Sequence, residues 1–257
     1  MLEKLIVKLK KDGFLQLCIA IVKYPFQIKK RISYRKMLLL EDSKDKFNEI
    51  YKNNLWLSAE SSSGPGSELI YTEPLRKWLV SKIQELKVKD FIDAPCGDYN
   101  WMKFVTPKVN INYLGLDIVD SLISKNKMEY EAPNIKFNVA DICKDSLPHC
   151  DIIMVRDCLF HLSYEDINSF LHNLATTEYK YLLTTNHKVE VNFNNSDIAT
   201  GDFRIIDLFS EPFCFDSNNI NDRVDDYPEG YAVKREMILI EKQYVPTSLS
   251  TLNEKKI

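Results

Sequence analysis

From residue 88 onward, short apolar runs alternate with amphipathic segments, and this order constrains the fold more than any other feature of the chain. Residues 88–94, 111–118, 135–139, 151–155, 179–185 and 235–241 are predicted strands, because they are apolar and rich in β-branched and aromatic residues. Residues 99–104, 119–130 and 164–175 are predicted helices. Strands that alternate with helices favour an α/β fold, in which helices cover both faces of a parallel sheet.

The first 87 residues have a different pattern. Residues 1–36 contain ten Lys or Arg and two acidic residues, so their net charge is +8 and that of the remainder is −11. Leu2, Leu5, Ile6 and Leu9 have the spacing of an amphipathic helix, which either packs on the protein itself or lies on an anionic membrane surface. Residues 41–54 are a predicted helix, and 61–67 a Ser/Gly loop. A further helix is predicted from residue 73 or 74 to 86, with Thr72 as its N-cap.

Composition excludes several classes of protein. The 257 residues are 45% hydrophobic, enough for one sizeable domain with an appendage. A net charge of −3 gives no basic field for nucleic acid. Six cysteines without a CxxC pair predict free thiols and no zinc site, and we assign no metal ligands from the sequence. The apolar run at 14–22 is too short to span a bilayer and lacks a signal-peptide exit, so we expect a cytoplasmic protein with optional contact to the inner membrane face through residues 1–36.

Three acids stand at the ends of successive predicted strands, where ligands bind in an open parallel sheet. Asp93 ends the first strand and precedes a turn with a single glycine, Gly97. Asp117 closes the second strand, where an acid can accept both ribose hydroxyls of a nucleoside cofactor or cap the next helix. Asp141 follows the third strand and either accepts an adenine amino group beside Ile142 or forms a turn. Together the three acids predict a nucleoside-cofactor site.

Five motifs resemble a bacterial branch of the class I S-adenosylmethionine (SAM)-dependent methyltransferases. They are ESSSGPGS (60–67), DAPCGDYNWM (93–102), RDCLFHLS (156–163), YLLTT (181–185) and TGDFR (200–204). The resemblance covers about residues 50–245. It implies a Rossmann-like class I methyltransferase fold, with a mostly parallel seven-stranded sheet and helices on both faces. The N-terminal helical extension at residues 1–40 lies outside the resemblance and is predicted from the apolar spacing alone.

The resemblance also implies SAM as cofactor and S-adenosylhomocysteine (SAH) as product. Some members of this branch are encoded beside capsule or surface-polysaccharide genes. The implied acceptor is therefore a hydroxyl, or a phosphoramidate or phosphate-linked group, of a surface-glycan precursor. The Ser/Gly loop has amides and hydroxyls that suit the methionyl carboxylate, although it could be an ordinary linker. The predicted cofactor contacts are Asp93, Ala94, Pro95, Cys96, Gly97, Asp117, Ile118, Asp141, Ile142, Arg156, Gly66 and Ser67.

Two histidines are candidates for the general base that a hydroxyl acceptor requires. His161 lies four residues after Asp157, so a helical turn would point both the same way, with Asp157 orienting His161. Asp157 could instead be the base or help to hold a divalent metal, and His161 could be purely structural. His187, after the fifth predicted strand, is the rival base.

The acceptor side is predicted less directly. Arg156 either binds an acceptor phosphate or forms a structural ion pair. By resemblance, Asp202 and Arg204 are acceptor-site residues, and turn chemistry around Gly201 is the alternative. The expected layout is an extension at 1–40, a helical cap with the Ser/Gly loop at 41–87, a core at 88–247 with an acceptor-site insertion at about 186–230, and a tail at 248–257.

Two other functions fit the same architecture. One is an NAD(P)-dependent oxidoreductase, which the sequence disfavours because close approach to a pyrophosphate needs two or three glycines in the first turn. SAM has no pyrophosphate, so one glycine suffices. The other is a non-catalytic relative acting as a partner protein, against which the three acids argue.

Overall fold

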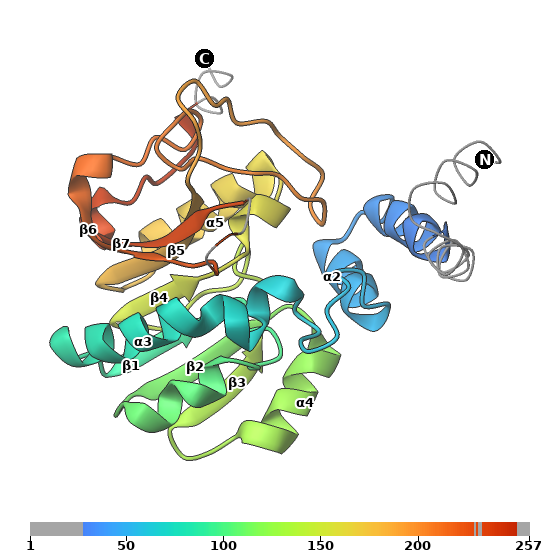
Figure 1. Ribbon diagram of the computed structural model, residues 1–257. Coiled ribbons are helices and arrows are strands. Elements are labelled where there is room, and N and C mark those ends of the chain that lie inside the picture. Colours follow the sequence, from blue (N-terminus) through green and yellow to red (C-terminus); the bar gives the residue numbers. More distant parts are fainter. Residues whose placement is uncertain (1–27, 229, 231–232, 251–257) are drawn as a thin grey trace.

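A computed structural model describes residues 28–228, 230 and 233–250 of the chain. Seven strands form one sheet in the order β3-β2-β1-β4-β5-β7-β6 (Figure 1). Neighbouring strands from β1 to β5 pair in parallel, whereas β7 is antiparallel to both β5 and β6. The strands are β1 (Asp90–Asp93), β2 (Asn112–Asp117), β3 (Ile135–Val139), β4 (Ile152–Val155), β5 (Tyr181–His187), β6 (Ile220–Asp225) and β7 (Arg235–Glu241). This arrangement confirms the predicted mostly parallel seven-stranded α/β fold.

The core consists of two apolar clusters on opposite faces of the sheet. In β4, Ile153 and Val155 belong to one cluster, and Ile152 and Met154 to the other. This alternation follows from the two-residue period of a strand. Both faces of the central strands are buried, which explains why the sequence shows continuous apolar runs there rather than alternating polarity.

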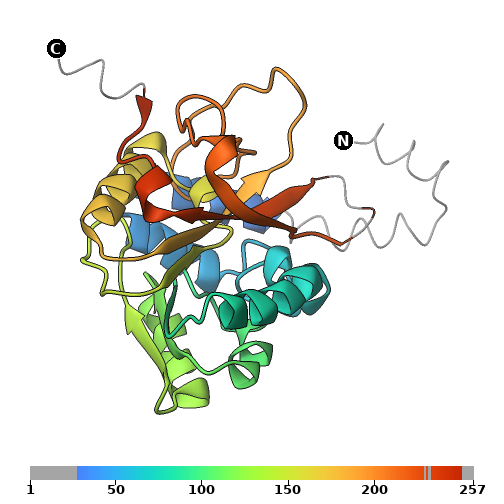
Figure 2. The same cartoon turned by 90° about the vertical axis from the view of Figure 1, so that its left-hand side faces the viewer.

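Helices cover the two faces unequally. Helix α5 (Tyr164–Thr176) contributes four buried residues to one cluster, while α3 (Leu69–Glu85) and α4 (Asp120–Tyr130) contribute to the other. Figure 2 shows α3 and α5 on opposite sides of the sheet. The predicted helix at 99–104 is only a 3₁₀ turn at Met102–Phe104.

The predicted N-cap of α3 is wrong. The helix begins at Leu69, and Thr72 lies inside it, fully buried, with its hydroxyl accepting a hydrogen bond from Arg76 Nε. The earlier start is possible because the carboxylate of Glu60 accepts the N–H of Leu69 at 2.8 Å, so a side chain distant in sequence caps the helix. Pro74 is consequently inside the helix rather than in its first turn.

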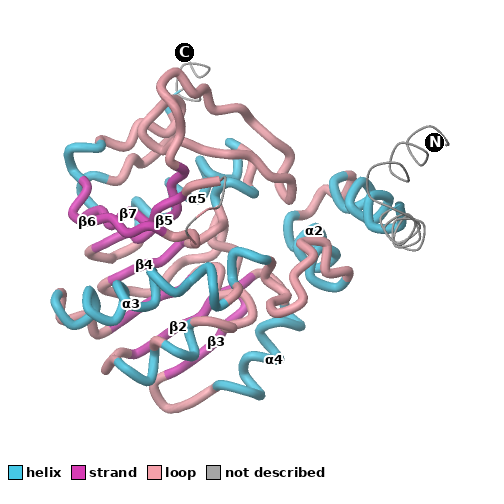
Figure 3. The backbone as a smooth tube through the Cα atoms, in the orientation of Figure 1, coloured by secondary structure: helices cyan, strands magenta, loops and turns pink. Residues whose placement is uncertain are grey.

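Between β5 and β6 the chain makes a long excursion without an α-helix (Figure 3). The predicted insertion at 186–230 is too broad, because β6 lies within it. His187, expected after the fifth strand, is the last residue of β5 and pairs with Arg235 of β7. The sequence of β6, INDRVD, is half exposed at the sheet edge and lacks the apolar run that predicts the other strands.

A helix at residues 28–38 and helix α2 (Ser43–Lys52) lie beyond the carboxyl ends of the central strands (Figure 1). Met37 and Ile50, one from each helix, are both 1% exposed, so this part of the chain packs on the protein. The predicted amphipathic helix with Leu2, Leu5, Ile6 and Leu9 lies outside the described residues. Within the described part of the chain, no helix is long and apolar enough to cross a membrane.

Candidate functional site

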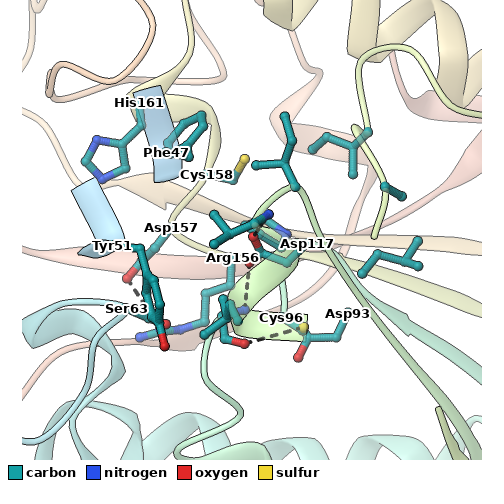
Figure 4. A pocket seen from close by; sticks show the side chains of 18 of the residues that line it. Phe47, Tyr51, Ser63, Asp93, Cys96, Asp117, Arg156, Asp157, Cys158 and His161 are labelled. Carbon is teal, nitrogen blue, oxygen red and sulfur yellow. Dashed lines mark hydrogen bonds and ion pairs between the residues drawn. The ribbon is translucent and has the colours of Figure 1, made fainter. Parts of the chain in front are cut away.

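A pocket lies between the carboxyl ends of β1, β2, β3 and β4 and the inner face of α2 (Figure 4). It contains about 1080 Å³ of empty space, part of it open to solvent. Helix α2 and the segment after it supply Ser43, Phe47, Tyr51 and Trp56. The carboxylates that line the pocket are Asp93, Asp117, Asp141, Asp157 and Asp166, and Arg156 is the one Lys or Arg among the described lining residues. The lining therefore favours a positively charged ligand over an anionic one.

The three acids predicted at strand ends all line this pocket. Asp93 is 2% exposed and accepts a hydrogen bond from the Tyr113 hydroxyl at 2.7 Å, and burial raises the pKa of its carboxyl to about 7. Asp117 accepts one backbone N–H at each carboxylate oxygen, from Gly97 at 3.1 Å and from Val119 at 3.0 Å. Burial nevertheless raises the pKa of Asp117 to about 6. Asp141 is more open, and its two oxygens meet the N–H of Cys143 and the Lys144 ammonium.

The turn after β1 holds the Ser/Gly loop against the pocket. Asp98 accepts hydrogen bonds from the hydroxyls of Ser61, Ser62 and Ser63, and its own N–H donates to Ser63 Oγ at 2.8 Å. Gly97 has φ +55, and a Cβ placed there would lie 2.3 Å from Ser63 Oγ. The glycine is therefore required by close approach of the loop. Asp98 thus holds the Ser/Gly loop in place, a role that we did not predict from the sequence although Asp98 stands beside Gly97 in the same motif.

Arg156 belongs to a buried group of four charges that we call the ion cluster: Arg156, Asp157, Asp226 and Arg235. Arg156 donates to both oxygens of Asp226, from Nε at 2.8 Å and from Nη2 at 3.0 Å. Its Nη1 lies 3.3 Å from Asp157 Oδ2, which Arg235 Nη1 also approaches at 3.0 Å. Arg156 Nη2 also donates to the carbonyl of Gly66 at 2.7 Å, tying the Ser/Gly loop to the cluster. Three of the five guanidinium N–H groups of Arg156 thus donate hydrogen bonds within the protein, and Nη1 forms the ion pair with Asp157.

Asp157 is fixed by its surroundings. Its φ of +52 is a conformation that non-glycine residues rarely adopt, and its N–H donates to Thr185 Oγ1 at 2.9 Å. Burial alone would raise the pKa of Asp157, but Arg156 and Arg235 lower it below the usual value. The carboxylate stays charged and engaged, which suits an orienting group better than a proton acceptor.

His161 and Asp157 both line the pocket and lie on the same side of the view in Figure 4. Its Nδ1 lies 2.7 Å from the carbonyl oxygen of Asp202, and its ring centroid is 5.3 Å from that of Trp56. Burial lowers the pKa of His161, so the imidazole is neutral near pH 7. A neutral imidazole facing a pocket can accept a proton.

The other predicted catalytic and acceptor residues lie behind the lining rather than in it. His187 is 2% exposed, its Nδ1 accepts the N–H of Ile206, and burial lowers its pKa to about 4. Arg204 is 5% exposed, lies over the Tyr164 ring and pairs with Asp197 at 3.6 Å. Asp202 is not among the lining residues, and its backbone carbonyl contacts His161 Nδ1.

The structure brings most of the predicted site residues to one place. The cofactor candidates that line the pocket are Asp93, Pro95, Cys96, Gly97, Asp117, Ile118, Asp141, Ile142, Arg156 and Ser67, and Asp157 and His161 join them. Ala94 is buried beneath the turn, and Gly66 contacts Arg156. Asp226 and Arg235 gave no signal in the sequence, since each acquires its role only by pairing across the sheet.

Comparison with known proteins gives a fold and no family. No known protein-family description matches the chain, and no curated protein matches it. Solved structures do match. PigF with SAH has a TM-score of 0.56 at 13% identity, over 89% of this chain and 73% of that one. Human N-acetylserotonin methyltransferase in complex with SAM has a TM-score of 0.51 at 11% identity, over 91% and 69%. The apo form of the SAM-dependent methyltransferase SibL has a TM-score of 0.50 at 13% identity, over 93% and 73%. At these identities the likeness shows the fold alone, a Rossmann-like class I methyltransferase fold.

Proposed function

We propose that this protein is a SAM-dependent methyltransferase that acts on a hydroxyl group. The observation that carries the proposal is the placement of Asp93, Asp117 and Asp141 at three successive strand ends in one acidic pocket. Two structures of the same fold, PigF and N-acetylserotonin methyltransferase, were solved with SAH and SAM respectively. SAM carries a sulfonium and an ammonium group, so a pocket lined by carboxylates suits it.

The donor and acceptor groups of the pocket fit this cofactor. Each oxygen of Asp117 takes one backbone N–H and retains a lone pair, so the carboxylate can accept the two hydroxyls of a ribose. Asp93 would face the ammonium group, and Ser63 and Ser67 would face the methionyl carboxylate. Asp141 and Ile142 would contact the adenine. Bound there, SAM would supply a methyl group already activated by its sulfonium.

The protein's own task is then to orient the acceptor and remove its proton. His161 is the proposed base: neutral near pH 7, it takes the hydroxyl proton at Nε2, because Nδ1 is committed to the Asp202 carbonyl. The charge of Asp157 raises the pKa of the imidazole, so it stabilises the cation that forms when the proton is transferred. Asp157 acts as an orienting charge, since its own oxygens are held by Arg156, Arg235 and Thr185.

The proposed acceptor is a sugar hydroxyl of a surface-glycan precursor. Phe47, Tyr51 and Trp56 give the pocket aromatic walls on which a sugar ring can lie. The lining Arg156 is paired with Asp226, and Arg204 lies behind the lining, so the described lining offers a phosphate no unpaired cation. This charge distribution favours an uncharged hydroxyl over the phosphate-linked or phosphoramidate alternative.

Calorimetric titration with SAH, SAM and NAD tests the cofactor. We expect SAH and SAM to bind and NAD not to bind, and Asp117→Asn to weaken SAH binding about tenfold or more through loss of the charged hydrogen bonds to the ribose. Asp90→Asn is the matched control, because Asp90 lies at the opposite end of the sheet and outside the pocket. NAD binding without SAH binding would identify an oxidoreductase, and binding of neither would identify a non-catalytic protein.

Methyl transfer from isotopically labelled SAM tests the acceptor. Simple glycosides and their phosphorylated counterparts should be offered in parallel, with His161→Gln as the base-deficient variant. We expect label in the uncharged glycosides and loss of transfer in His161→Gln with SAH affinity retained. Label confined to phosphorylated sugars would refute the hydroxyl proposal while leaving the cofactor assignment intact.

A further inference from the structure

The loop at residues 199–204 is bound to the His161 segment by several hydrogen bonds, three of which involve Phe160 or His161. Gly201 N–H donates to the His161 carbonyl at 2.8 Å, and Arg204 N–H donates to the Phe160 carbonyl at 3.1 Å. Between them, His161 Nδ1 meets the Asp202 carbonyl at 2.7 Å. The loop therefore holds both the backbone and the ring of His161.

The Asp202 carbonyl selects one tautomer of His161. A carbonyl oxygen can only accept a hydrogen bond, so Nδ1 must carry the proton when the two atoms are 2.7 Å apart. In the neutral ring the lone pair is then on Nε2. Without the Asp202 carbonyl, the neutral ring could carry its proton on Nε2. The lone pair would then be on Nδ1, which is not the nitrogen proposed to accept the proton.

The orientation of Asp202 is fixed by its own loop, in which Phe203 N–H donates to Asp202 Oδ1 at 2.8 Å, and by a contact from outside the catalytic core. Tyr34, on the helix at 28–38, donates its hydroxyl to Asp202 Oδ1 at 2.6 Å. The same helix places Met37 against Gly201, where a Cβ would lie 2.9 Å from the Met37 sulfur. Gly201 has φ +96, so it is required both for the turn and for the approach of the helix. The helix at 28–38 thus contacts the loop at 199–204 through a charged hydrogen bond from Tyr34 and through packing of Met37.

We propose that Tyr34 is a positioning residue that acts through Asp202 to hold His161 in the Nδ1–H tautomer. The helix at 28–38 thereby keeps the proposed general base ready to accept a proton at Nε2. This inference rests on the proposed function for its meaning, but the tautomer itself is measurable without any substrate. The proposal assigns a role to the helix at 28–38, which lies outside the strand-end motifs. Its Tyr34 is 168 residues from Asp202 in the sequence.

The other groups that face His161 do not fix its tautomer. Asp157, at the end of β4, raises the pKa of His161 through its charge, and Arg204 lowers it. His187, on β5, reaches the same surroundings through the Phe160 ring and has its own Nδ1 engaged by Ile206. Among the described contacts of the imidazole, the hydrogen bond to Asp202 is the one that distinguishes the two nitrogens.

The test is ¹⁵N–¹H NMR of the full-length protein labelled at histidine, recorded at pH 8, where His161 is neutral. The chain has four histidines, and the His161 signals are identified by their absence in His161→Gln. We expect the Nδ1–H pattern in the wild type. Tyr34→Phe should shift the tautomer ratio toward Nε2–H by about fivefold or more, the effect of losing one hydrogen bond. Tyr244→Phe, a surface tyrosine remote from the pocket, is the matched control and should leave the ratio unchanged.

Asp202→Asn is the second variant, in case Tyr34→Phe does not fold. It retains the shape of the side chain but makes its bond to Tyr34 neutral and weaker, so the shift should have the same direction and a smaller size. A wild-type Nε2–H pattern overturns the proposal, as does an unchanged ratio in folded Tyr34→Phe or an equal shift in Tyr244→Phe. SAH affinity should stay within about twofold in Tyr34→Phe, the variation expected for a change outside the cofactor contacts. Loss of SAH binding by the wild type would instead refute the proposed function and leave the tautomer result standing.

Discussion

Two regions meet at the pocket and are built in different ways. On the cofactor side (Asp93, Gly97, Asp117 and Asp141), the residues follow strand ends and their partners lie on the adjoining strands and turns, as when Asp117 binds the N–H groups of Gly97 and Val119. On the acceptor side (His161, residues 199–204 and the helix at 28–38), the partners come from segments far apart in the sequence, as when Tyr34 binds Asp202. Strand topology alone places the first set, whereas the second depends on particular contacts between distant segments.

The largest expected effect is at the ion cluster, where the two regions are joined. Asp226→Asn should lower the free energy of unfolding by about 3–5 kcal/mol, because it leaves Arg156 and Arg235 buried with one carboxylate between them. Urea denaturation measures this. The matched control is Asp225→Asn, one residue earlier, which removes an exposed partner of Lys188 and should change stability little. If Asp226→Asn lowers the free energy of unfolding by less than about 1 kcal/mol, the ion cluster does not stabilise the contact between the two regions.

The second prediction concerns the cofactor side, where burial favours the protonated form of Asp93 in the protein without a ligand. The pKa of Asp93 is raised from 3.8 to about 7, so the folded protein holds this proton more tightly than the unfolded chain. The stability from that proton is fully present below about pH 4 and is lost as the pH rises through 7. Relative to Asp93→Asn, the wild type should lose about 3 kcal/mol of unfolding free energy between pH 4 and 7. Parallel curves for the two proteins would contradict the buried, protonated Asp93.

The smallest of the three expected effects is at Gly97, in the turn after β1. Gly97→Ala should reduce the free energy of unfolding by about 2 kcal/mol, the strain of a positive φ. It should also reduce SAH affinity, because the new Cβ meets Ser63 and displaces the Ser/Gly loop. Gly230→Ala is the control, since Gly230 has φ +88 but a Cβ added there would meet no atom within 4 Å. Equal behaviour of the two variants in SAH titration would show that the loop contact is unimportant.

The same contrast explains what could be predicted from the sequence. The strand at 135–139 and the strand at 235–241 have the limits that the sequence predicts, and the acids at strand ends lie together in one pocket as expected. These features depend on local periodicity and on the geometry of parallel strands. Strand β6 and the cap of α3 escape prediction, because one lacks an apolar run and the other is capped by Glu60 from another segment. The partners of Arg156 and Asp202 could not be predicted, since pairing over 70 and 168 residues leaves no local pattern.

The strand order has a consequence for how this chain acquires its structure. Strand β7 follows the other six strands of the sheet in the chain, yet it lies between β5 and β6 and carries Arg235 into the ion cluster. Asp226 stands just before it, 70 residues after the Arg156 it neutralises. Until the final hairpin is added, β5 presents an open edge and Arg156 lacks its closest counter-charge. The ion cluster beside the pocket is therefore completed late in folding, after the β6–β7 hairpin has been synthesised.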